Sequence, residues 1–235
     1  MTPVQWFIAV CFAFLCGSFP TGYIIGRARG VDIRKLGSGN IGATNVGRVF
    51  GRRAWLLCFS GDFFKGFGPV LGAGVVSGIA GRWSPPLDQA LFWCAALAAA
   101  VFGHMFTPWL GFKGGKGVAT ALGSLLGFFP ILTFSGIAAL GVFIVVLKLW
   151  RYVSLASICA TAGLPVFVLI QTGVTLFLRP DDMDKSPAIS AGLSVAALTA
   201  VISSFMIYRH RSNIARLRAG TEPKTGSEHV VAPAQ

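Results

Sequence analysis

Long apolar runs alternate along the chain with short segments that carry most of the charged residues. A helix that crosses a bilayer needs about 20 consecutive, mainly apolar residues. Several runs are close to this length or longer, and we predict that each forms a membrane-spanning helix. These runs are Val4–Gly26, Ala54–Ala80, Gln89–Leu110, Leu132–Leu149, Val153–Phe177 and Ile189–Tyr208.

A shorter apolar stretch, Val118–Phe129, cannot cross a bilayer alone. Gly127 and Pro130 separate it from the next run, which predicts a short helix that dips into the membrane and turns back. Counted with the longer runs, it gives an all-α polytopic membrane protein of about seven transmembrane helices. We expect one integral-membrane domain over residues 1–222. The remainder, residues 223–235, lacks periodicity and is predicted to be disordered.

The basic residues indicate the orientation. Segments on one side of the predicted membrane hold 16 Lys and Arg residues, and segments on the other side hold three. Because basic loops stay in the cytoplasm, we expect the N-terminus outside and the C-terminus in the cytoplasm. The basic segments are Arg27–Arg53, Lys113–Lys116, Lys148–Arg151 and the tail from Arg209.

The amino-acid composition also indicates a membrane protein. Apolar residues make up 54% of the 235 positions and charged residues 12%, against about 45–50% and about 25% in soluble domains. The net charge of +12 suggests either nucleic acid or an anionic leaflet. Because the charges lie between apolar runs, we expect membrane lipids as partners and no nucleic acid. The five cysteines lie inside apolar runs and are read as small buried apolar residues without metal or redox chemistry.

Residues 37–48 read GSGNIGATNVGR. Glycines let backbone N–H groups crowd around an anion, and an arginine can add a bidentate phosphate contact. The alternative is a solvated turn, but only Ile41 and Val46 would anchor such a turn at the membrane boundary. We therefore predict an anion site whose donors are Ser38, Gly39, Asn40, Thr44, Asn45 and Arg48.

Residues 111–120 read GFKGGKGVAT, so Lys113 and Lys116 flank Gly114 and Gly115 just before the predicted short helix. Backbone N–H groups, the positive helix end and two ammonium groups could converge there on one anion. The segment is not a nucleotide-binding P-loop, because Gly117 stands where that motif needs Ser or Thr for magnesium.

Charged or titratable residues inside apolar runs often mark function. Asp62 and Lys65 lie on one helical face, and either a structural ion pair or a substrate contact by Lys65 fits this spacing. His104 lies in the third predicted span, where an interior hydrogen-bonded histidine and a substrate contact are both compatible with the sequence.

The segment HRSNI places His210 and Asn213 on one helical face where the last span leaves the membrane, among several arginines. A histidine there can donate or accept a proton near neutral pH. Ser154 follows Arg151 at the start of another span. Serines in membrane helices often only bond backbone carbonyls, so Ser154 is a supporting candidate.

Four of these segments, in order, are GSGNIGATNVGR, GHMFTPWLGFKGGKGVAT, RYVSLASI and YRHRSNIARL. Together they resemble the bacterial membrane glycerol-3-phosphate acyltransferases that use acyl phosphate, the PlsY family, over about Val4 to Glu222. This resemblance implies transfer of a fatty acyl group from acyl phosphate to the sn-1 hydroxyl of glycerol 3-phosphate. The products are lysophosphatidic acid and inorganic phosphate, in the first step of phospholipid biosynthesis at the bacterial plasma (inner) membrane.

The resemblance also implies roles for these residues. The acyl-phosphate head group would contact the donors of residues 38–45, and glycerol 3-phosphate or the developing charge would contact Arg48, Lys113, Lys116, His210 and Asn213. Lys65, His104, Gly114, Gly115 and Ser154 are further candidates for substrate binding. Neither histidine segment has an Asp four residues later, so a His–Asp dyad is not expected. We expect no cofactor and no metal. The oligomeric state is left open.

Two other classes compete with this interpretation. A phosphate transporter would need polar residues at mid-bilayer and two related halves, and neither is evident in the sequence. A CDP-alcohol phosphotransferase would need clustered aspartates for divalent metal, but Asp32, Asp62 and Asp88 are scattered.

Overall fold

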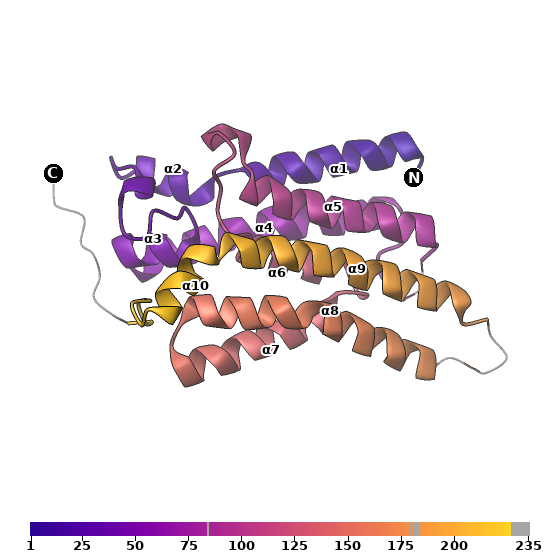
Figure 1. The fold of residues 1–235 in the computed structure, drawn as a ribbon. Coiled ribbons are helices and arrows are strands. Elements are labelled where there is room, and N and C mark those ends of the chain that lie inside the picture. Colours follow the sequence, from indigo (N-terminus) through magenta and orange to yellow (C-terminus); the bar gives the residue numbers. More distant parts are fainter. Residues whose placement is uncertain (84, 179, 181–183, 227–235) are drawn as a thin grey trace.

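The computed structural model describes residues 1–83, 85–178, 180 and 184–226, and the ordered elements within these ranges are all helical. The long helices lie side by side in one bundle (Figure 1). In chain order, the elements are α1 (Pro3–Ser18), α2 (Thr21–Arg27), η1 (Ile33–Lys35), α3 (Ala43–Phe50), α4 (Arg52–Val76), α5 (Leu87–Met105), η2 (Pro108–Leu110), α6 (Val118–Gly127), α7 (Thr133–Trp150), α8 (Val153–Phe177), α9 (Ser186–Arg209) and α10 (Arg211–Arg218).

The prediction of an all-α, multi-pass architecture is confirmed. Five described segments are long and apolar enough to cross a membrane. Helix α4 has a spanning length of 25 residues but carries four charged side chains, and α6 has only ten residues. The total of seven spans and the orientation of the termini stay predictions. The five segments are Pro3–Arg27, Leu87–Leu110, Thr133–Trp150, Val153–Phe177 and Ser186–Arg209.

The first predicted span, Val4–Gly26, is not one continuous helix. It breaks between α1 and α2 because Pro20 has no N–H with which to continue the helical hydrogen bonds. The carbonyl oxygen of Phe19 therefore lies outside both helices, and it accepts a hydrogen bond from Lys65 Nζ on α4 at 2.7 Å. The break thus creates a polar anchor for the ammonium group of Lys65 on α4.

Two further boundaries differ from the sequence prediction. Helix α5 ends at Met105 and not at Leu110, since Pro108 begins the separate η2 turn. His104 therefore lies in the last turn of α5, nearer to the helix end than predicted. The second half of the segment at residues 37–48 is helical, because α3 begins at Ala43. No helix is predicted there from the sequence, and the buried side chain of Val46 holds this short helix against the bundle.

Glycines bring two pairs of helices into backbone contact. A Cβ atom added at Gly103 on α5 would lie 2.3 Å from the carbonyl oxygen of Phe14 on α1, and one added at Gly123 on α6 would lie 2.1 Å from that of Phe63 on α4. Small residues allow this close approach, which favours dispersion contacts between membrane helices. Helix α6, too short to span a bilayer alone, is held in place by α4.

The buried core fixes the far end of α6. The ring of Phe128, just after α6, stacks on Trp93 of α5 with centroids 3.9 Å apart. Trp93 Nε1 donates a hydrogen bond to the carbonyl oxygen of Val70 on α4 at 2.7 Å. Both rings are fully buried. Since the indole polar atom is satisfied, this cluster links α4, α5 and α6 without a buried orphan group.

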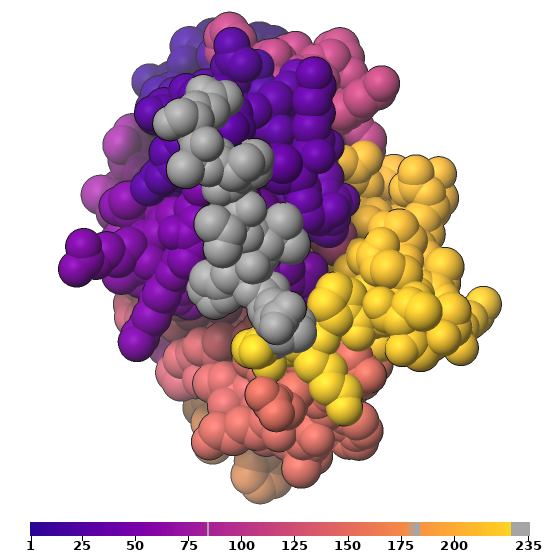
Figure 2. All heavy atoms as spheres, turned by 90° about the vertical axis from the view of Figure 1, so that its left-hand side faces the viewer, coloured from indigo at the N-terminus to yellow at the C-terminus, as the bar shows by residue number. Residues whose placement is uncertain are grey.

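The helices α2, α3 and α10, with seven or eight residues each, gather at one end of the bundle (Figure 1). The N-terminus lies at the opposite end, and α2, α3 and α10 lie together (Figure 1). Figure 2 looks onto this end and shows the indigo N-terminal segments beside the yellow C-terminal helix, with the salmon junction of α7 and α8 below them. Residues from all four polar motifs, among them Ser38, Lys116, Ser154 and His210, line one shared cavity.

Candidate active site

A cavity of about 460 Å³ opens between these motifs. Its polar part is lined by side chains from α3, the start of α6, the start of α8 and the joint between α9 and α10, and its deeper part is apolar. It brings together many residues that the sequence singled out: Ser38, Asn40, Thr44, Asn45, Arg48, His104, Lys116, Ser154, His210 and Asn213.

Asn45 organises the first motif from within. Its Oδ1 accepts a hydrogen bond from the N–H of Ser38 at 2.8 Å, and its Nδ2 donates to the carbonyl oxygens of Leu36 (3.0 Å) and Ile33 (3.4 Å). The side chain is only 1% exposed. These bonds hold the turn before α3 and place Ser38 at the cavity. The oxygen and the nitrogen of the Asn45 amide both bond backbone groups, so Asn45 supports this wall of the cavity.

Opposite this wall, five side chains form one hydrogen-bond network. Lys116 Nζ donates to Asn213 Oδ1. Asn213 Nδ2 and Ser154 Oγ donate to the same carboxylate oxygen of Glu222, at 2.7 and 2.6 Å, and Arg216 Nε donates to the other at 2.7 Å. The Asn213 amide is therefore oriented from both ends, and Lys116 is directed into the cavity. Arg48 and Lys116 are the cationic side chains among the described cavity residues.

Burial tunes the charges of this network. It lowers the pKa of Lys116 to about 8. The negative charge of Glu222 raises this pKa, and the positive charges of Arg216, Arg48 and Arg209 lower it. For Glu222, burial would raise the pKa, but hydrogen bonds from its partners reverse this and lower it. A lysine ammonium that loses its proton more readily than usual is poorly solvated, and a bound phosphate would compensate it.

His210 ends α9 and is 2% exposed. Its Nδ1 lies 2.8 Å from the carbonyl oxygen of Met206. Because a carbonyl only accepts, Nδ1 carries the proton and Nε2 is the acceptor in the neutral ring. Burial first, and then the charge of Lys116, lowers the pKa of His210 to about 4. The imidazole is therefore neutral near pH 7.

The second glycine-rich segment differs from the expected anion loop. The N–H groups of Gly114 and Gly115 donate to the carbonyl oxygens of Met105 (3.1 Å) and His104 (3.2 Å), so they are not free for an anion. The start of α6 can offer N–H groups to an anion instead, because Lys116, Gly117 and Val118 line the cavity there. Among the described residues, no side chain caps this helix, and its hydrogen bonds begin only with the N–H of Ala121. Its uncapped N–H groups can bind an anion.

A family model described as glycerol-3-phosphate acyltransferase matches residues 7–220 of the chain. The chain belongs to the glycerol-3-phosphate acyltransferase family. Members from Geotalea daltonii and Synechococcus elongatus are 43% and 42% identical over 216 and 219 residues. These alignments cover 92% and 91% of this chain and 95% and 91% of the two relatives. The resemblance found in the sequence is thereby confirmed.

Two solved structures of a family member also match this chain. The crystal structure of PlsY, an integral membrane glycerol 3-phosphate acyltransferase, in its glycerol 3-phosphate form matches with a TM-score of 0.74 and 37% identity, covering 95% of this chain and 96% of that one. The lysophosphatidic acid form of PlsY matches with a TM-score of 0.72 at the same identity. This acyltransferase family member therefore shares the fold of an integral membrane enzyme.

Some of the predicted site residues do not line the cavity. Lys65 Nζ lies 2.7 Å from Asp62 Oδ1 and bonds Phe19 as described, so its ammonium is occupied by the protein. Lys113 is exposed. Gly39, Gly114 and Gly115 do not line the cavity either. Substrate contacts by these residues stay predictions, and the geometry favours supporting positions for them.

Glu222 is the residue that sequence reasoning missed. It is buried at 6% exposure and holds the network together, although it was treated only as the last residue before a disordered tail. The described part of that tail is also bound: Thr225 N and Oγ1 donate to the carbonyl oxygen of Arg151 (2.7 and 3.0 Å), and Arg48 donates to that of Pro223 (3.3 Å). Residues 227–235 of the predicted tail lie outside the described residues. A lone carboxylate within a strongly basic segment was the available signal.

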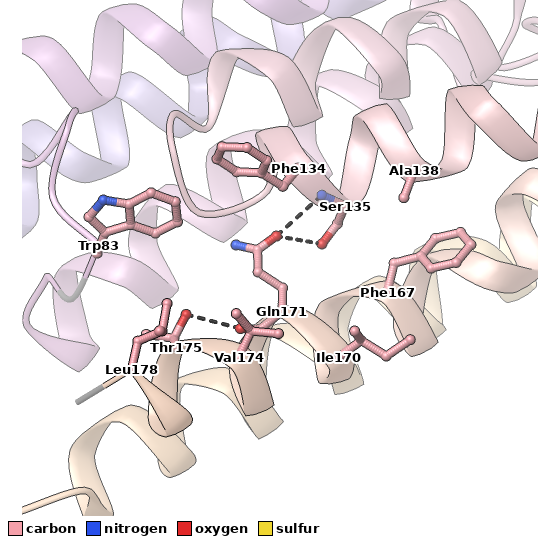
Figure 3. A pocket seen from close by; sticks show the side chains of 10 residues that line it. All are labelled: Trp83, Phe134, Ser135, Ala138, Phe167, Ile170, Gln171, Val174, Thr175 and Leu178. Carbon is pink, nitrogen blue, oxygen red and sulfur yellow. Dashed lines mark hydrogen bonds between the residues drawn. The ribbon is translucent and has the colours of Figure 1, made fainter. Parts of the chain in front are cut away.

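A second, larger cavity of about 700 Å³ lies between the N-terminal half of α7 and the C-terminal half of α8 (Figure 3). Its lining is apolar except for Ser135, Gln171 and Thr175. Gln171 Oε1 accepts hydrogen bonds from the N–H and Oγ of Ser135 at 3.2 and 2.8 Å, so these polar atoms are satisfied (Figure 3). With no ionisable side chain among its described lining residues, this cavity offers nothing to a phosphorylated substrate.

The glycine pair gives a first testable prediction. A Cβ atom at Gly115 would lie 2.1 Å from His104 Nε2, so Gly115→Ala must displace either the buried His104 ring or the backbone that leads into Lys116. We expect kcat/KM for glycerol 3-phosphate to fall by about 10²-fold, the cost of a displacement of about 1 Å at a positioning group. Gly141→Ala on α7, where a Cβ would meet nothing within 4 Å, is the matched control. Equal activity of the two variants would contradict this expectation.

Proposed function

We propose that this protein transfers a fatty acyl group from acyl phosphate to the sn-1 hydroxyl of glycerol 3-phosphate, at the cytoplasmic face of a bacterial inner membrane. The observation that carries the proposal is the pairing of Lys116, at the uncapped start of α6, with Arg48 across one cavity. Two phosphorylated substrates need two sets of anion donors, and this cavity has both. The glycerol 3-phosphate and lysophosphatidic acid forms of PlsY, at 37% identity, support the acceptor and the product.

The apolar part of the cavity fits a lipid donor. Trp55 and Phe59 on α4, Leu122 on α6, and Phe143 and Ile144 on α7 line it below the polar network. Trp55 and Ile144 are 38% and 43% exposed, so the edges of this groove are open at the surface of the bundle. An acyl chain could enter sideways while its phosphate stays at the polar end. A soluble acyl donor would not need such an edge.

In the proposed reaction, the sn-1 hydroxyl oxygen attacks the carbonyl carbon of acyl phosphate. The new ester C–O bond forms, the C–O bond to the phosphate breaks, and the leaving phosphate takes the hydroxyl proton. Acyl phosphate is a mixed anhydride and is already activated. The protein then has to align the substrates and neutralise charge, which Arg48, Lys116 and the start of α6 can do.

The deciding experiment is an assay of the detergent-purified protein with glycerol 3-phosphate and either palmitoyl phosphate or palmitoyl-CoA, each with and without EDTA. We expect lysophosphatidic acid and inorganic phosphate from palmitoyl phosphate only, and no effect of EDTA. Turnover of palmitoyl-CoA alone would replace the proposed donor. If neither donor reacts while the folded protein still binds glycerol 3-phosphate, a transport function would become the better explanation.

A further inference from the structure

Arg209, the last residue of α9, does not face the cavity; it reaches the second glycine-rich segment instead. Its Nε donates to the carbonyl oxygen of Gly115 at 3.2 Å, and a terminal nitrogen of the same guanidinium donates to that of Gly114. The guanidinium also lies over the ring of Phe106, 5.7 Å from the centroid. The planar side chain thus holds two successive carbonyl oxygens at once.

The glycine pair is held from its other side by His104. A Cβ at Gly114 would lie 2.0 Å from the His104 carbonyl oxygen, and one at Gly115 would lie 2.1 Å from Nε2 of the same residue. His104 Nδ1 lies 3.6 Å from Asp62 Oδ1, which Lys65 also contacts. The two glycine peptides therefore lie between a buried imidazole and a guanidinium, with both their N–H and C=O groups engaged.

Arg209 and the glycine pair that it bonds are each next in sequence to a site residue. Lys116 follows Gly115, and His210 follows Arg209. We propose that Arg209 is a positioning residue, which sets the separation between Lys116 and the His210–Asn213 face and so determines the affinity for the phosphate of glycerol 3-phosphate. This inference rests on the proposed function, because it assumes that Lys116 binds that phosphate. Arg209 itself is not among the residues that line the cavity.

Physical chemistry explains why an arginine is needed. Glycine peptides rotate at low cost, and a rotated peptide at Gly114 or Gly115 would turn a carbonyl oxygen toward the bound anion. The guanidinium fork bonds both oxygens, and neither glycine lines the cavity, so the fork holds both peptides in this orientation. A lysine keeps the charge but presents a single point donor, so it cannot fix both peptides.

The test compares Arg209→Lys with Arg211→Lys. Arg211 is a matched control because it lies two residues away, is exposed, and stacks over Tyr208 at 4.7 Å, away from the glycines. Steady-state kinetics would give kcat and the KM of both substrates, calorimetry would give the Kd of glycerol 3-phosphate, and thermal unfolding would report stability. Arg209→Gln is a second variant in case Arg209→Lys does not fold.

We expect Arg209→Lys to raise the KM and the Kd of glycerol 3-phosphate by about 10- to 100-fold, the size of one lost charge-assisted hydrogen bond. The KM of acyl phosphate and the unfolding temperature should match those of Arg211→Lys. Equal values of Kd in the two variants, or a loss of stability without any change in KM or Kd, would overturn the proposal. If the wild-type protein does not turn over acyl phosphate, the proposed function fails, while the Kd comparison still decides the role of Arg209.

Discussion

Lys116→Ala is expected to lower kcat/KM for acyl transfer by about 10³-fold, the cost of removing a donor aimed at developing charge. Lys116 is one of two cationic side chains among the described cavity residues, and it lies beside the uncapped start of α6. Neither bulk water nor Asn213 can replace a positive charge there. The measurement is initial-rate kinetics with palmitoyl phosphate and varied glycerol 3-phosphate.

Two further variants make this result specific. Lys113→Ala removes a charge from the same segment, but Lys113 is exposed and does not line the cavity, so we expect less than about a tenfold loss because exposed charges are screened. Lys116→Met should not lower the unfolding temperature, since burial of the Lys116 ammonium is unfavourable, as its lowered pKa of about 8 indicates. Full activity of Lys116→Ala would exclude Lys116 from the site.

The sequence allowed much of the fold and of the site to be predicted, because both depend on strong local patterns. Apolar length located the spanning helices, and Val153–Phe177 agrees with α8 at both ends. Glycine-rich, cation-bearing segments at the ends of these spans marked Arg48 and Lys116. His210 and Asn213 share a helix face through a simple spacing. The structure brings these residues into one cavity, as their common side of the predicted membrane required.

What the sequence could not reveal depends on contacts between distant segments. Glu222 lies alone in a basic stretch, and its importance appears only where Ser154, Asn213 and Arg216 meet it. In the same way, the glycine pair was expected to bind an anion through its N–H groups, but these bond the end of α5. Local motifs show which groups are available for binding. They do not show which groups the protein itself already occupies.

The pH dependence of kcat/KM is the second large effect that we expect. Activity should fall above about pH 8, by about tenfold per pH unit, because Lys116 then loses the proton that makes it an anion donor. An ordinary lysine would keep its proton to a pH about 2.5 units higher, so a fall in activity that begins near pH 8 reflects the burial of Lys116. Lys116→Arg stays protonated throughout, and any activity that it retains should show no limb near pH 8. A wild-type profile that is flat to pH 10 would contradict this assignment.

The acid side of the same profile separates the two possible roles of His210. A base with a pKa of about 4 is always available near neutral pH but is weak. The leaving phosphate, whose second pKa is about 6, is the better proton acceptor. We therefore expect His210→Gln to lose about 10- to 100-fold in turnover, as for a lost hydrogen bond to a charged group. Its activity should still fall above about pH 8, and any fall that the wild type shows at acid pH should be kept. A loss beyond about 10⁴-fold, together with disappearance of an acid limb near pH 4, would instead make His210 the general base.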